Sequence, residues 1–162
     1  MRFPIHPELK PVIAAAAEIA AQVQRPAIEP ADLLLAFCRA IELPVGQKFG
    51  VCKLSLRQLE DECLAAESTG PVPEQPEFGR AALALFSQAV DPATFFGRRQ
   101  ISAADLAATM ACDNAVIGML IRAGLDPRGY NKLQDDLIAL AKIQRDGDPN
   151  ESPHAAVEKT VH

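Results

Sequence analysis

Apolar residues recur with helical spacing along most of this sequence. Between Leu9 and Val23 they fall three or four positions apart, which predicts a helix of about four turns with one buried stripe. A second helix is expected to begin at Pro30, because proline is favoured at the first helical position. Similar patterns predict a short helix over residues 45–49 and another that begins near Ser55.

The pattern of the first half occurs again in the second half. The stretch AIEPADLLLAF begins at Ala27, and its match QISAADLAATM begins 73 positions later at Gln100. This offset becomes 74 after one inserted residue, and the pairs include Val12 with Leu85, Ile28 with Ile101, Val51 with Leu125, Leu59 with Leu133, and Cys63 with Leu137. Apolar positions match and polar ones differ, as expected where packing constrains only the buried faces.

These matches predict an all-α fold of two tandem four-helix repeats related by a pseudo-twofold axis. We expect the repeats to cover residues 5–67 and 76–143, within one domain of residues 1–143, and the turn-forming stretch 68–75 to separate them. Residues 144–162 are polar and turn-rich without an apolar stripe, so we expect a disordered tail. The DGDPNE fragment in that tail resembles the start of a calcium loop but lacks the required glycine.

Several residues mark where the predicted helices begin and end. Asp32 and Asp105 are equivalent and lie in the first turn of their helices, where a carboxylate stabilises the positive helix end. We interpret them as caps, and a ligand site across the repeat axis is the alternative. Gly50 is expected to end its helix in a left-handed conformation. Pro92 falls inside a predicted helix, so we expect a kink or break near Asp91.

Composition and charge exclude several classes of protein. The chain has 162 residues, of which 49% are hydrophobic, and this is enough for a compact core. A net charge of −5, without a dense Lys/Arg stripe and without Trp, disfavours nucleic acid as a partner. No apolar run approaches the roughly 18 residues that suggest a membrane span. The four cysteines show no C-x-x-C spacing and follow no signal sequence, so we expect reduced thiols in the cytoplasm.

The two halves together resemble a known module. Each contains an alanine-rich helix, an Ile-x-x-x-Asp-Leu pattern, a glycine at a turn and a closing helix, and the second half also contains GMLIRAGLD, which begins at Gly118. This arrangement is similar to the N-terminal domain of the Clp chaperone ATPases and covers roughly residues 5 to 143. The resemblance implies a module that docks substrates or adaptor proteins and carries no chemistry itself.

The sequence departs from the pattern of that family in two respects. It contains no G-x-x-x-x-G-K-[ST] phosphate loop, so we expect no ATP hydrolysis by that route. In some relatives an acidic residue at the start of the second helix of each repeat helps to bind phosphorylated arginine. Ala31 and Ala104 stand at these positions here, and neither supplies a carboxylate for a guanidinium group. That activity is therefore not expected of this chain.

The resemblance and the missing ATPase together predict a non-catalytic protein-interaction module. Its partners would be substrates, adaptors or degron peptides, and it would act as an adaptor or decoy for a Clp ATPase or protease. The candidate partner-binding residues are apolar, aromatic or basic, and they are Phe3, Ile5, Phe78, Phe95, Arg98 and Arg99. Phe3, Ile5 and Phe78 precede the first helix of each repeat and either staple the helix starts, as we favour, or line a groove.

Two other classes of function are considered. The cleft between the repeats can sequester a small molecule or a hydrophobic peptide. A helical enzyme would need polar groups that converge in that cleft, and the apolar pairing leaves little polar material for them. We therefore expect no catalytic residue, no metal site and no cofactor.

Overall fold

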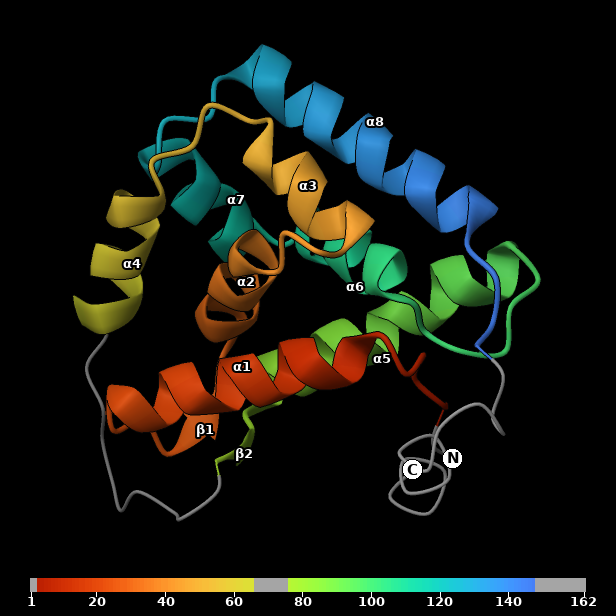
Figure 1. The fold of residues 1–162 in the computed structure, drawn as a ribbon, viewed down its shortest axis with the longest axis horizontal. Helices are drawn as coiled ribbons and strands as arrows, with labels where there is room; N and C mark the ends of the chain where they lie inside the picture. The colour runs from red at the N-terminus through yellow and green to blue at the C-terminus, as the bar shows by residue number, and fades with distance from the viewer. Residues whose placement is uncertain (1–2, 66–75, 148–162) are drawn as a thin grey trace.

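The computed structural model describes residues 3–65 and 76–147, and eight α-helices in this part confirm the predicted all-α fold (Figure 1). The predicted separator at residues 68–75 lies outside the described residues. Of the predicted disordered tail, residues 144–162, the structure describes only residues 144–147. The helices are α1 Leu9–Gln22, α2 Pro30–Arg39, α3 Pro44–Gly50, α4 Leu56–Ala65, α5 Arg80–Phe95, α6 Ala103–Met110, α7 Asn114–Arg122 and α8 Pro127–Ile143.

The second helix of each repeat lies at the centre of the molecule. Figure 1 shows α1 and α5 along one side and α8 along the opposite side, with α2 and α6 between them. The helix α2 packs against α1, α3 and α4, and α6 packs against α5 and α8. All residues of α6 except Thr109 are buried, as expected for a helix that is apolar on nearly every face.

The paired apolar positions of the two repeats share one core. Val12, Leu85, Leu59 and Leu133 are each exposed by no more than 2% and belong to the same cluster of buried residues. The prediction of matched buried faces is confirmed at these positions. It is wrong at Val51, which is 69% exposed because it follows the end of α3.

The segments that lead into the two repeats are exchanged between them. The strand β1 (Ala27–Ile28) pairs in parallel with β2 (Glu77–Phe78), and Ile5 forms the corresponding parallel bridge with Ile101. The offset of 73 relates Ile5 to Phe78 and Ile28 to Ile101. The Ile5–Ile101 and Phe78–Ile28 contacts are therefore equivalent, with the roles of the two repeats exchanged. Each leading segment therefore pairs with the connection between the first two helices of the other repeat.

The first helix of each repeat ends in the same turn. Gln24 and Gly97 follow α1 and α5 in left-handed conformations, with φ of 56° and 77°. In both turns the next N–H, from Arg25 or Arg98, donates to the carbonyl five residues earlier at 2.8 Å, which is a Schellman motif. The predicted left-handed cap at Gly50 is wrong, since Gly50 is the last residue of α3 and lies outside the left-handed region.

We expect Gly97→Ala to lower the free energy of unfolding by about 1 kcal/mol. A Cβ at this position meets no atom within 4 Å, so the cost comes from the left-handed backbone alone. Gly50→Ala is the matched control, because its Cβ is equally unobstructed but the backbone is helical, and it should stabilise the protein. Urea denaturation compares the two variants, and equal effects would contradict the argument.

The proline inside α5 does not interrupt the helix. Pro92 lies in the last turn and a half of α5, and the helix continues to Phe95, so the break expected near Asp91 does not occur.

Within the described residues, no single helix is both long and apolar enough to cross a membrane. The pair α6 and α7 meets that test only when the two are taken together across an 80° bend.

Candidate functional site

The structure separates the six candidate residues predicted from the sequence into buried and exposed groups. Ile5 and Arg98 are buried, and Phe3 and Phe78 are partly buried against the core. Phe78 also packs on the Phe86 ring, with centroids 4.9 Å apart. The apolar residues that lead into the repeats thus serve the junction between repeats. Phe95, which is 83% exposed at the end of α5, and the exposed Arg99 remain accessible to a partner.

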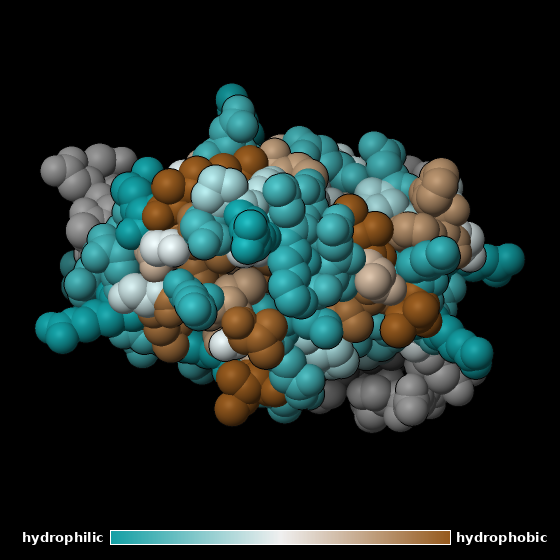
Figure 2. All heavy atoms as spheres, turned by 90° about the horizontal axis from the view of Figure 1, so that it is seen from above, coloured by the Kyte–Doolittle hydropathy of each residue, from teal (hydrophilic) through white to brown (hydrophobic). Residues whose placement is uncertain are grey.

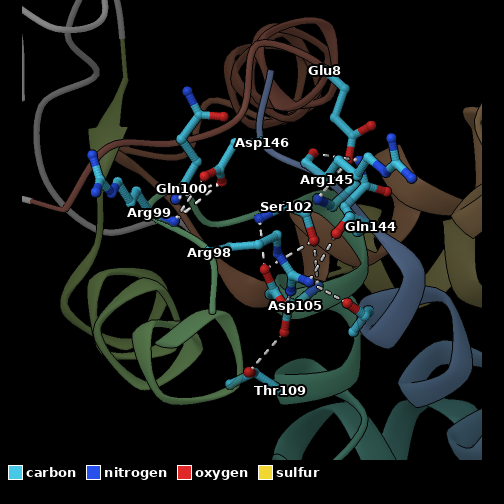
Figure 3. A network of polar contacts seen from close by, with 12 residues as sticks. Glu8, Arg98, Arg99, Gln100, Ser102, Asp105, Thr109, Gln144, Arg145 and Asp146 are labelled. Carbon is cyan, nitrogen blue, oxygen red and sulfur yellow. Dashed lines mark hydrogen bonds and ion pairs between the residues drawn. The ribbon is translucent and has the colours of Figure 1, made fainter. Parts of the chain in front are cut away.

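Arg98 lies at the centre of a buried polar network (Figure 3). Its guanidinium donates to the carboxylate of Asp105 at the start of α6 and to the carbonyl of Ala141 near the end of α8. Asp105 also accepts from the backbone N–H of Ser102 at 2.8 Å and from the Ser102 hydroxyl at 2.9 Å. One arginine therefore joins the end of α5, the start of α6 and the end of α8.

The first repeat contains the same arrangement. Arg25 donates to both carboxylate oxygens of Asp32, at 2.8 and 3.2 Å, and to the carbonyl of Cys63 in α4 at 2.8 Å. Asp32 in turn accepts from the N–H of Glu29 at 2.9 Å. Both aspartates are fully buried, which confirms that they cap α2 and α6 and leaves neither carboxylate open to a ligand.

A cleft of about 290 Å³ lies where the α3–α4 connection meets the start of α8. Val51 and Leu125, which are equivalent in the two repeats, both line it. Two of its carboxylates are already engaged: Asp126 caps α8 through the N–H of Gly129, and Asp136 accepts from Lys132 at 2.7 Å. Lys53 and Arg128 complete the charged rim, and neither forms an ion pair within the described residues.

Exposed apolar side chains also occur on the neighbouring helices α4 and α7. The N–H of Ser55 donates to the carbonyl of Ala123 at 2.8 Å, so the start of α4 lies beside the end of α7. Leu56 and Ile121 flank this contact, and both are exposed. Figure 2 views the molecule from the side of α8 and shows hydrophobic residues in several groups among hydrophilic ones.

The fold has counterparts among solved structures. The Hsp104 N-terminal domain from Candida albicans matches with a TM-score of 0.71 at 17% identity, over 88% of this chain and 94% of that one. The N-terminal domain of the chaperone ClpD from Arabidopsis thaliana gives a TM-score of 0.69 at 15% identity, over 88% and 97%. The chain has the fold of a Clp N-terminal domain.

A third Clp N-terminal domain with this fold has been solved with a peptide. It is the ClpV N-domain in complex with a VipB peptide, which matches with a TM-score of 0.60 at 13% identity, over 83% of this chain and 87% of that one. No family model and no curated protein matches the sequence. The likeness to Clp N-terminal domains is therefore a likeness of fold.

The positions at which the chain departs from the pattern of Clp N-terminal domains lie beside the buried carboxylates. Ala104 is fully buried in α6, and Ala31 is partly buried in α2. The neighbouring Asp32 and Asp105 are held by arginines, so they do not substitute for the missing acidic residues. The structure therefore gives no reason to expect that these helix starts bind the guanidinium group of a phosphorylated arginine from a partner.

The cleft contains a thiol, Cys52, that is not activated. Burial, followed by the charge of Asp136, raises the pKa of the Cys52 thiol, so this thiol stays protonated at neutral pH. Burial likewise raises the pKa of Cys38 to about 12 and that of Cys63 to about 11. No group of three or more metal-ligating side chains occurs in the described parts of the chain. The Cys52 thiol is therefore not an activated nucleophile.

The thiols should differ sharply in reactivity. With a thiol-titrating disulfide at neutral pH, the exposed Cys112 should react quickly, whereas the buried Cys63 should react only when the protein unfolds. Stability should also fall as the pH rises from the ordinary thiol value of 9.0 towards 11, because unfolded Cys63 ionises there while the folded thiol stays protonated. Equal reaction rates for Cys63 and Cys112 would contradict this assignment.

Proposed function

We propose that this Clp N-terminal domain is a non-catalytic docking module that binds a segment of another protein in the cleft between its repeats. The observation that carries the proposal is the pairing of Val51 with Leu125 at the cleft. Val51 is largely exposed although its equivalent, Leu125, is buried. An exposed aliphatic side chain beside a cleft, flanked by charged groups, is the usual composition of a contact surface.

The chemistry of the cleft supports contact over catalysis. Its two carboxylates cap a helix or pair with Lys132, and its thiol is protonated, so none of these three groups is free to act as a base or a nucleophile. A peptide complex is known for the ClpV N-domain, which has the same fold. The partners proposed for this chain are a Clp ATPase, its adaptors or its protease clients in the cytoplasm, with the chain acting as adaptor or decoy.

A pull-down from native lysate with matched variants tests the proposal. Val51→Glu places a charge at the cleft, whereas Ile41→Glu changes an equally exposed aliphatic residue, also 69% exposed, at the other end of α3. Val51→Glu should lower recovery of the Clp subunit, adaptor or client at least about tenfold, and Ile41→Glu should not. Recovery of no such partner, or the same recovery with both variants, would argue against the cleft.

Sequestration of a small hydrophobic ligand is the second candidate function, and the cleft is small for it. Pockets for such ligands span about 300 to 1,000 Å³, so 290 Å³ lies at the lower limit. A thermal shift with hydrophobic small molecules, and none with peptides, would support sequestration in place of docking.

A further inference from the structure

The connection between α5 and α6 carries a carboxylate site that is filled by the chain itself. The carboxylate of Asp146 accepts from the backbone N–H of Arg99 at 3.0 and 3.1 Å and from the N–H of Gln100 at 3.1 Å (Figure 3). Two successive N–H groups that converge on one carboxylate form an anion-binding nest. Asp146 reaches this nest from beyond the end of α8, 46 residues away from Gln100.

The first repeat cannot form this site. The offset of 73 places Pro26 at the position of Arg99 and Ala27 at the position of Gln100. Proline has no N–H to donate, so one of the two donors is missing there. The carboxylate site is thus a feature of the second repeat alone and is not required by the common architecture of the two repeats.

Residues 144–147, which we call the strap, fit the connection closely. The N–H of Gly147 donates to the side-chain oxygen of Gln100 at 2.7 Å, and Arg98 donates to the carbonyl of Gln144 at 3.3 Å. A Cβ on Gly147 would lie 2.9 Å from Cδ of Pro7 and 3.1 Å from Nε2 of His6. The site therefore selects an acidic residue followed by glycine.

The strap is held by contacts that water can replace. Arg99 and Asp146 are both exposed, so water competes for the hydrogen bonds between them. The side chain of Arg99 forms no ion pair within the described residues, and the exposed Phe95 lies close by in the sequence at the end of α5. The connection thus offers a partner more contacts than the strap uses.

We propose that the α5–α6 connection is a docking site for an acidic Asp-Gly segment of a partner protein, and that the strap occupies this site until a partner displaces it. The tethered strap has a high effective concentration, so a partner must add contacts of its own to compete. Arg99 and Phe95 are the residues that would provide them. This site is separate from the cleft at Val51, so either proposal can fail without the other.

The test uses the full chain and a peptide with the sequence of residues 142–147, KIQRDG. In the Asp146→Ala protein the nest is empty, so the peptide should shift the backbone amide signals of Arg99 and Gln100 in NMR spectra. Wild-type protein should bind the peptide at least about tenfold more weakly, because Asp146 competes in cis. A control peptide, KIQRAG, should shift neither signal.

Removing the backbone N–H of Arg99, which donates to the carboxylate, tests the same site. Arg99→Pro in the Asp146→Ala background introduces the residue that the first repeat tolerates at this position, and peptide binding should be lost. Gln100→Ala removes only the side-chain oxygen that accepts from the N–H of Gly147. It should weaken peptide binding although the backbone N–H groups of residues 99 and 100 are both kept. Equal peptide binding by wild-type and Asp146→Ala proteins, or no shift at Arg99 and Gln100, would overturn the proposal.

Discussion

Asp105→Ala should lower the free energy of unfolding by about 3–5 kcal/mol, which is among the largest effects of any single change in this protein. The substitution leaves Arg98, a residue that is 7% exposed, without its buried counter-ion. It also removes the acceptor for the Ser102 N–H at the start of α6. Urea denaturation with an intact-fold check by circular dichroism measures the loss.

A double-mutant cycle separates the ion pair from the cap. Arg98→Met with Asp105→Ala removes both charges, and its loss should be smaller than the sum of the single losses, because no unpaired charge stays buried. Asp91→Ala, at an exposed position of α5, is the matched control and should change stability by no more than about 0.5 kcal/mol. Additive losses in the cycle would contradict the assigned pairing.

Gly46→Ala should destabilise the fold by about 3 kcal/mol, at the upper end of the usual range for overpacking. A Cβ on Gly46 would lie 1.9 Å from the carbonyl oxygen of Ala40 and 2.5 Å from its carbon. Both are backbone atoms after the end of α2, so no side-chain rotation relieves the clash, and α3 must move away from α2.

The same short helix provides the control for this prediction. Gly50→Ala adds an identical methyl group to α3 where no atom lies within 4 Å, and it should be neutral or stabilising. Thermal unfolding of the two variants measures the contrast. A Gly46→Ala protein as stable as Gly50→Ala would show that α3 does not pack on α2 as described.

The repeat and the helices follow from the sequence because buried faces are constrained at every turn. Leu59 and Leu133 could be paired by offset alone, and both are in the core. The exchange of leading segments could not be predicted, since strands of two residues such as β1 leave no periodic signal. Val51 was misassigned to the core because an apolar match between repeats cannot distinguish a loop from a helix face.

The buried ion pairs were within reach of the sequence and were missed. Arg25 and Arg98 obey the same offset of 73, and each precedes its aspartate by seven residues. The match between the repeats was drawn from apolar positions, which do not include these arginines. Arg98 was therefore predicted to bind a partner, whereas the structure buries it. A cleft between the repeats was predicted, but the residues that line it and the strap site were not, because each brings together segments that are distant along the chain.

Site-specific photo-crosslinking tests most directly the central claim that the inter-repeat cleft docks protein segments. Val51→p-benzoylphenylalanine places the reactive group at the cleft, and Ile41→p-benzoylphenylalanine places it at the other end of α3. In native lysate, position 51 should crosslink to a Clp subunit, adaptor or client, and position 41 should not. Crosslinks of equal yield from both positions, or from position 41 alone, would contradict the account.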